Sequence, residues 1–192
     1  MKIAKYKNNG LATTIALFLV AILIALFAKA FIVQPYIVDG QSMETTLQNN
    51  DRLLVNKLPL TFAHFGHKYV PNRGDIIIFN QSGLPGFNSS KKLIKRVIGL
   101  PGDRVVIKDG LITIYNASRP TGFNPDTQTG YKINATSTSG SVDTILAWDQ
   151  IFVCGDNRNN SEDSRYFGPV NINQIEGKLA FRILPLGKAQ HY

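Results

Sequence analysis

The sequence from 91 to 116 reads KKLIKRVIGLPGDRVVIKDGLITIYN and alternates short apolar runs with turn residues. The runs at 93–98, 105–107 and 111–115 are rich in β-branched side chains, which favour strands. The turn signals LPGD and DG separate them, and KDGL at 108–111 has the composition of a hairpin turn. The stretch therefore predicts consecutive short strands.

The pattern continues on both sides of this stretch. Further β-rich runs at 76–79 and 151–153 are bounded by the turn signals NRGD and GDN. No long amphipathic helical pattern follows residue 35. We therefore expect a mainly β fold, a coiled β-sheet or barrel.

The segment from 117 to 141 is rich in Thr, Ser, Asn and Gly and has few large apolar residues. It reads as surface loops of a small inserted β sub-domain. We therefore expect a catalytic β domain made of 34–103 and 149–192, interrupted by an inserted sub-domain at 104–148.

The N-terminal part of the chain predicts one transmembrane helix. Residues 11–28 carry no charge, and the apolar run resumes after Lys29 as far as Val33, where Pro35 would stop a helix. The expected anchor, 11–33, is long enough to cross a bilayer. The basic N-terminus, 1–10, is expected to stay in the cytoplasm.

Two other readings of this run stay open. The run could be a cleavable signal peptide, because Ala28-Lys29-Ala30 has the look of a cleavage site. It could also be a buried core helix. We favour the uncleaved anchor, because the run exceeds the usual roughly 7–15 apolar residues of a signal peptide and shows no polar face.

Composition excludes several function classes. The formal net charge is +8, but no basic run interleaves with aromatic residues, so no nucleic-acid partner is expected. The single cysteine, Cys154, cannot form an internal disulfide and is expected to be a small buried residue at a strand end. The only histidines are His64, His67 and His191, so neither a metal site nor a Ser-His-Asp triad is expected, and no cofactor.

Three segments could carry chemistry. Ser42 lies in GQSMETTL (40–47), shortly after the apolar run, although a serine beside glycine is usually a turn residue. Lys95 would share a strand face with Leu93 and Val97, and burial there would depress its pKa and make it a general base. The alternative is a solvated basic strand. The polar loop GDNRNNSEDSR (155–165) either is a solvated turn or orients a site.

Taken together, these segments resemble the bacterial type I signal peptidases, the leader peptidase family with a Ser/Lys dyad. The resemblance rests on SM (42–43), RGDIIIF (73–79), KRVIGLPGD (95–103) and GDNRNNSEDSR (155–165), in the family's order and after an N-terminal anchor. The resemblance is weakest in the segment 117–141.

The resemblance implies a membrane-bound serine endopeptidase that removes signal peptides from secretory pre-proteins. Ser42 would be the nucleophile and Lys95 the general base. It further implies that the Ser161 hydroxyl orients the lysine amine, that Gly155 leaves room for the lysine, and that Asp163 and Arg165 form a supporting ion pair.

The resemblance also implies where substrates bind and where the enzyme acts. Shallow apolar pockets for the small side chains of Ala-x-Ala sites would be lined by Val38, Met43, Leu93 and Ile94. The catalytic domain would lie on the outer side of a bacterial plasma (inner) membrane, in contact with the lipid bilayer.

The chain departs from the family pattern at two positions. Thr45 stands where proline is usual, which loosens the nucleophile turn without removing a reacting group. Gly40 stands where some members carry a serine that completes the oxyanion hole, so the second donor is open. Two other functions therefore stay in view: a dedicated peptidase for a narrow client such as a pilin-type precursor, and a decayed, non-catalytic membrane-anchored binding protein.

Overall fold

The computed structural model describes residues 10–63, 69–83, 89–128, 131, 133, 135 and 137–192. The basic residues Lys2, Lys5 and Lys7, and the histidines His64 and His67, lie outside the described residues.

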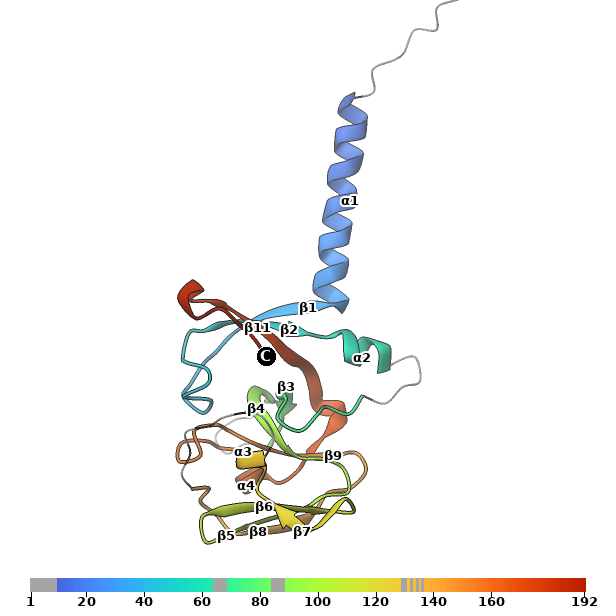
Figure 1. Ribbon diagram of the computed structural model, residues 1–192. Coiled ribbons are helices and arrows are strands. Elements are labelled where there is room, and N and C mark those ends of the chain that lie inside the picture. Colours follow the sequence, from blue (N-terminus) through green and yellow to red (C-terminus); the bar gives the residue numbers. More distant parts are fainter. Residues whose placement is uncertain are drawn as a thin grey trace, which may run out of the picture.

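The first element of the described residues is the apolar helix α1, Gly10–Phe31, which projects away from a β-rich body (Figure 1). The helix ends two residues before the predicted limit of the anchor, because Val33 already belongs to strand β1, Val33–Ile37. The residue before a proline avoids the α conformation, so Pro35 favours this early change to extended backbone. Strand β1 pairs with β2, Arg52–Asn56.

The first sheet has eight strands and carries most of the body. Its order is β1-β2-β11-β3-β4-β9-β10, with β12 paired to β11. The remaining strands of this sheet are β3 (Ile76–Gln81), β4 (Lys91–Gly99), β9 (Gln150–Cys154), β10 (Val170–Asn171), β11 (Ile175–Leu184) and β12 (Gln190–His191). Neighbouring strands of this sheet are antiparallel, and the pairs β2/β11, β3/β11 and β4/β9 join parts of the chain that are distant in sequence.

The second sheet has four strands in the order β7-β6-β5-β8. They are β5 (Arg104–Lys108), β6 (Leu111–Asn116), β7 (Arg119–Phe123) and β8 (Val142–Ile145). Asp109 and Gly110 both have positive φ and turn the chain between β5 and β6. The second sheet shares its core with the first sheet, since Ile98 and Phe152 belong to the same apolar cluster as Ile107 and Ile112. The division at 104 and 148 stays a proposal.

The mainly β prediction is confirmed. The runs at 76–79, 93–98, 105–107, 111–115 and 151–153 lie in β3, β4, β5, β6 and β9. In the described part of the chain, the helices after α1 are short: α2 (Leu58–Ala63), α3 (Pro125–Gln128), α4 (Ser164–Phe167) and the 3-10 turns Ile172–Gln174 and Leu186–Lys188.

Among the described residues of the segment from 117 to 141, the structure has regular elements that the composition does not predict. The segment holds β7 and α3, and the side chain of Thr138 is buried. The strand sequence RPTGF lacks the β-rich pattern, and β7 forms because it pairs with β6 at the edge of the second sheet, where a proline is tolerated.

Candidate active site

Ser42 lies in the connection between β1 and β2. The connection is closed at its base by Val38 N, which donates to Asp51 O at 2.9 Å. Met43 and Leu47 are fully buried in one apolar cluster, so they hold this turn against the sheet. Gly40 has φ +106, a conformation that L side chains rarely adopt, and its N–H donates to Asn49 Oδ1.

Lys95 reaches this turn from the middle of β4. The side chain is 3% exposed, and its Nζ lies 2.7 Å from Ser42 Oγ. Burial lowers the pKa of Lys95 to about 8, although the carboxylate of Asp163 acts in the opposite direction. Lys91 and Lys92 on the same strand are exposed. The structure therefore brings together a hydroxyl and an amine that titrates near neutral pH.

Gly155 allows a third segment to pack against the same turn. A Cβ at this position would overlap the Ser42 carbonyl oxygen and the Ser161 hydroxyl. Asn157 N donates to that carbonyl oxygen at 3.1 Å. The Ser161 hydroxyl is buried and has no hydrogen-bond partner among the described residues, so it is not bonded to Lys95 in this state.

Asp163 and Arg165 form a buried ion pair, with Arg165 Nε 2.7 Å from Asp163 Oδ1. The same carboxylate accepts from Gly155 N at 3.0 Å. The next residue, Ser164, accepts from Val153 N through its Oγ. These bonds attach the polar loop to the end of β9.

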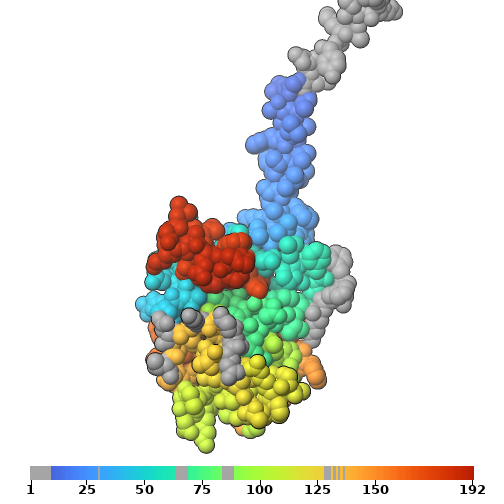
Figure 2. Space-filling view, in the orientation of Figure 1, coloured from blue at the N-terminus to red at the C-terminus, as the bar shows by residue number. Residues whose placement is uncertain are grey.

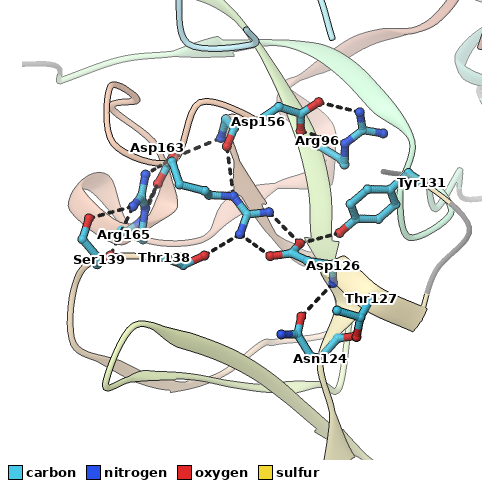
Figure 3. Close-up of polar contacts among 12 residues, drawn as sticks. Arg96, Asn124, Asp126, Thr127, Tyr131, Thr138, Ser139, Asp156, Asp163 and Arg165 are labelled. Atoms are coloured by element: carbon cyan, nitrogen blue, oxygen red, sulfur yellow. Dashed lines mark hydrogen bonds and ion pairs between the residues drawn. The ribbon is translucent and has the colours of Figure 1, made fainter. Parts of the chain in front are cut away.

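A second buried ion pair was not assigned a role from the sequence. Arg96 Nε lies 2.8 Å from Asp156 Oδ1, and Arg96 Nη2 contacts Asp156 Oδ2 (Figure 3). Thr46 Oγ1 donates to Asp156 Oδ2, which links the Ser42 turn to this pair. The partner of Arg96 lies sixty positions away along the chain, so no local pattern pointed to this pair.

The apolar residues expected to line the substrate pockets divide into two groups. Val38, Met43 and Ile94 belong to one cluster beside the Ser42 turn. Leu93 packs with Val97 in another cluster, because adjacent residues of a strand point to opposite faces. The structure thus does not bring Leu93 to the other three.

Other features of the body lie apart from this arrangement. An apolar groove at the foot of α1 is lined by Phe27, Phe31, Leu58 and neighbouring side chains, and by neither Ser42 nor Lys95. Cys154 is buried at the end of β9, and burial raises the pKa of its thiol. Among the described residues, no group of three or more His, Cys, Asp or Glu side chains could hold a metal ion.

Comparisons with known proteins point to one family. The model of the family "Signal peptidase, peptidase S26" matches residues 11–184. A signal peptidase I P of Bacillus subtilis subsp. natto is 33% identical over 195 residues, covering 97% of this chain and 96% of that protein. A signal peptidase IB of Staphylococcus aureus strain N315 is 30% identical, covering 90% of this chain and 88% of that protein.

One solved structure is also similar. The crystal structure of a signal peptidase I from Enterococcus faecalis aligns with 57% of this chain and 97% of that chain, at 30% identity and a TM-score of 0.40.

Proposed function

This chain belongs to the signal peptidase family, peptidase S26, whose endopeptidases remove signal peptides; from that premise we propose that it cuts with Ser42 as nucleophile and Lys95 as general base. The observation that carries the proposal is the 2.7 Å distance between Lys95 Nζ and Ser42 Oγ within a buried environment. A neutral lysine at this distance is within reach of the hydroxyl proton.

The proposed reaction has two stages. The amine of Lys95 takes the proton of Ser42 while Oγ attacks the scissile carbonyl carbon. The tetrahedral intermediate then collapses as Lys95 gives this proton to the leaving nitrogen, so the mature chain departs with a neutral amino group and Lys95 is neutral again. The signal peptide remains as an ester on Ser42. Lys95 next takes a proton from water, the hydroxide attacks the ester, and Ser42 Oγ leaves with the proton.

We propose that the substrate binds as an added strand. Strand β1 stands at the end of the sheet order, so its outer edge is not paired within that order, and Val38 follows it directly. An extended cleavage region could pair with this edge through main-chain hydrogen bonds. Small side chains of an Ala-x-Ala site would then face the cluster of Val38, Met43 and Ile94.

We further propose that α1 is an uncleaved anchor in a bacterial plasma membrane. By length and composition, Gly10–Lys29 can cross a membrane, and its side chains are exposed. The exposed apolar residues Ile37, Phe181 and Leu186 lie in β1 and the C-terminal segment, which Figure 2 shows at the same end of the body as α1. Lysines before residue 10 favour a cytoplasmic N-terminus, which leaves the β body outside.

The experiment is cleavage of a labelled pre-protein by the full chain in detergent. Ser42→Ala and Lys95→Ala are compared with Ser118→Ala and Lys92→Ala, which change exposed residues of the same types. We expect cutting after an Ala-x-Ala site by the unmodified chain and both controls, and none by the two dyad variants. Full activity of Lys95→Ala would exclude the proposed base.

The substrate range separates the general peptidase from the narrow-client alternative. An unmodified chain that is inert on several precursors but cuts a pilin-type precursor supports the dedicated peptidase. A chain inert on all of them supports the decayed binding protein. The preserved pairing of Ser42 with Lys95 argues against the decayed binding protein, and both peptidase alternatives would share it.

A further inference from the structure

The peptide groups of Gly155 are held from both sides by buried ion pairs. Its N–H donates to Asp163, which is paired with Arg165. Its carbonyl oxygen accepts from Arg158 Nε at 3.0 Å, and Arg158 is paired with Asp126. The pair of Asp163 with Arg165 was expected from the sequence. In the second pair, Asp126 comes from a segment to which the sequence assigned no role.

Asp126 lies in α3, within the segment 117–141. Its two carboxylate oxygens accept from Nη1 and Nη2 of Arg158 at 2.5 and 2.7 Å, a bidentate arrangement. Thr138 Oγ1 accepts from the same Nη1 at 2.6 Å. Asn124 Oδ1 accepts from Asp126 N at 2.9 Å and so holds the start of this turn.

The same carboxylate also connects to the strand that carries Lys95. Tyr131 donates its hydroxyl to Asp126 Oδ1 at 2.9 Å, and its ring lies 4.4 Å from the guanidinium carbon of Arg96. Figure 3 shows Asp126, Tyr131 and Arg96 in sequence across this region. Asp126 therefore contacts both elements that flank the dyad: the loop of Gly155 and, through Tyr131, the neighbour of Lys95.

We propose that Asp126 is a positioning residue for the reaction, acting through Arg158 on Gly155. Because Gly155 packs directly against the Ser42 carbonyl and the Ser161 hydroxyl, a small movement of its peptide group moves both. Loss of the Asp126 carboxylate leaves the buried Arg158 guanidinium without its counter-charge, so the loop must rearrange. Displacements of about 1 Å can reduce turnover about 100-fold. The inference rests on the proposed roles of Ser42 and Lys95.

The test compares Asp126→Asn with Asp143→Asn in the full chain. Asp143 pairs with Arg104 in the same bidentate way, but both side chains are about half exposed. At equal folded concentration, measured by circular dichroism, Asp126→Asn is expected to lower kcat about 10- to 100-fold and to leave KM within roughly twofold. Asp143→Asn should match the unmodified chain, and Asp126→Glu, which keeps the charge, should recover part of the loss.

Equal kcat per folded molecule for Asp126→Asn and Asp143→Asn would overturn the proposal. If Asp126→Asn does not fold, Thr138→Val removes one acceptor of Arg158 and keeps the side-chain size. The Thr138→Val variant should then lower kcat about 3- to 10-fold, and an unchanged kcat overturns the proposal. An unmodified chain that does not cut at all contradicts the proposed function instead, so the two failures are distinguishable.

Discussion

The amine of Lys95 and the hydroxyl of Ser42 come from segments 53 positions apart and lie 2.7 Å from one another. The lysine is buried on β4, and the serine is held by the buried side chains next to it in the turn. Burial favours the neutral form of an amine, so the fold supplies both the distance and the protonation state that a general base needs.

The pH dependence of cleavage should report on Lys95. Its pKa is lowered to about 8 by burial, so only roughly a tenth of the molecules hold the neutral amine at pH 7. We expect kcat/KM to rise about tenfold per pH step below 8 and to level off above it. The measurement is kcat/KM from pH 6 to 10, with Lys92→Ala as the control that should keep the profile. A rise of kcat/KM centred near pH 10.5 would contradict the assignment of Lys95 as the general base.

Replacing the lysine should stabilise the fold at neutral pH. The pKa of Lys95 is about 8 in the folded chain against an ordinary value of 10.5, so the unfolded chain binds more protons between these values. Stability of the unmodified chain therefore rises with pH across this window, and below pH 8 the buried charge lowers it by about 3 kcal/mol.

Lys95→Met removes this charge and keeps an unbranched side chain of similar length. We expect the variant to be more stable than the unmodified chain at pH 6, with the difference decreasing as the pH rises from 8 to 10.5. Denaturant unfolding at several pH values measures it. A difference that does not change with pH would show that the charge is not its cause.

Gly155→Ala should abolish activity. The new methyl group would overlap the Ser42 carbonyl oxygen and the Ser161 hydroxyl, and both belong to segments fixed by other contacts. Overpacking of this kind costs about 1–3 kcal/mol of stability, and displacement of the Ser42 turn lowers kcat. Gly187→Ala is the matched control, because nothing lies within 4 Å of the added atom. Native turnover of Gly155→Ala would rule out this packing argument.

Ser161→Ala should separate catalysis from stability. The hydroxyl is buried without a hydrogen-bond partner among the described residues, so its removal should leave the free energy of unfolding unchanged or slightly higher. If the hydroxyl orients the Lys95 amine during the reaction, kcat should fall by at least about tenfold. The two measurements are kcat and denaturant unfolding. Loss of stability with unchanged kcat would instead indicate a structural role.

Local sequence patterns predicted the strands and the anchor-like helix well. Alternation of β-branched residues with turn signals depends only on neighbouring residues, and it placed β3, β5, β6 and β9. It could not place β7, whose RPTGF sequence is a strand only because β6 lies beside it. It also could not show that α1 ends at Phe31, since pairing with β2 decides where β1 begins.

The candidate site was found from four short motifs rather than from geometry. They identified Ser42, Lys95, Gly155, Ser161, Asp163 and Arg165 as residues of interest, and the structure brings all six into one region. The resemblance placed Leu93 with Ile94 in the substrate pockets, whereas strand alternation puts the two side chains in different apolar clusters.

By itself, therefore, the sequence determined the mainly β class, the apolar N-terminal segment and the residue types available for catalysis, because these follow from local composition and periodicity. Only the tertiary structure decided that Lys95 is buried beside Ser42, that Arg96 pairs with Asp156, and that Asp126 holds Arg158. Such contacts join segments 30 to 60 positions apart, and their distances depend on how strands and loops that are distant along the chain pack together. No local pattern encodes that packing.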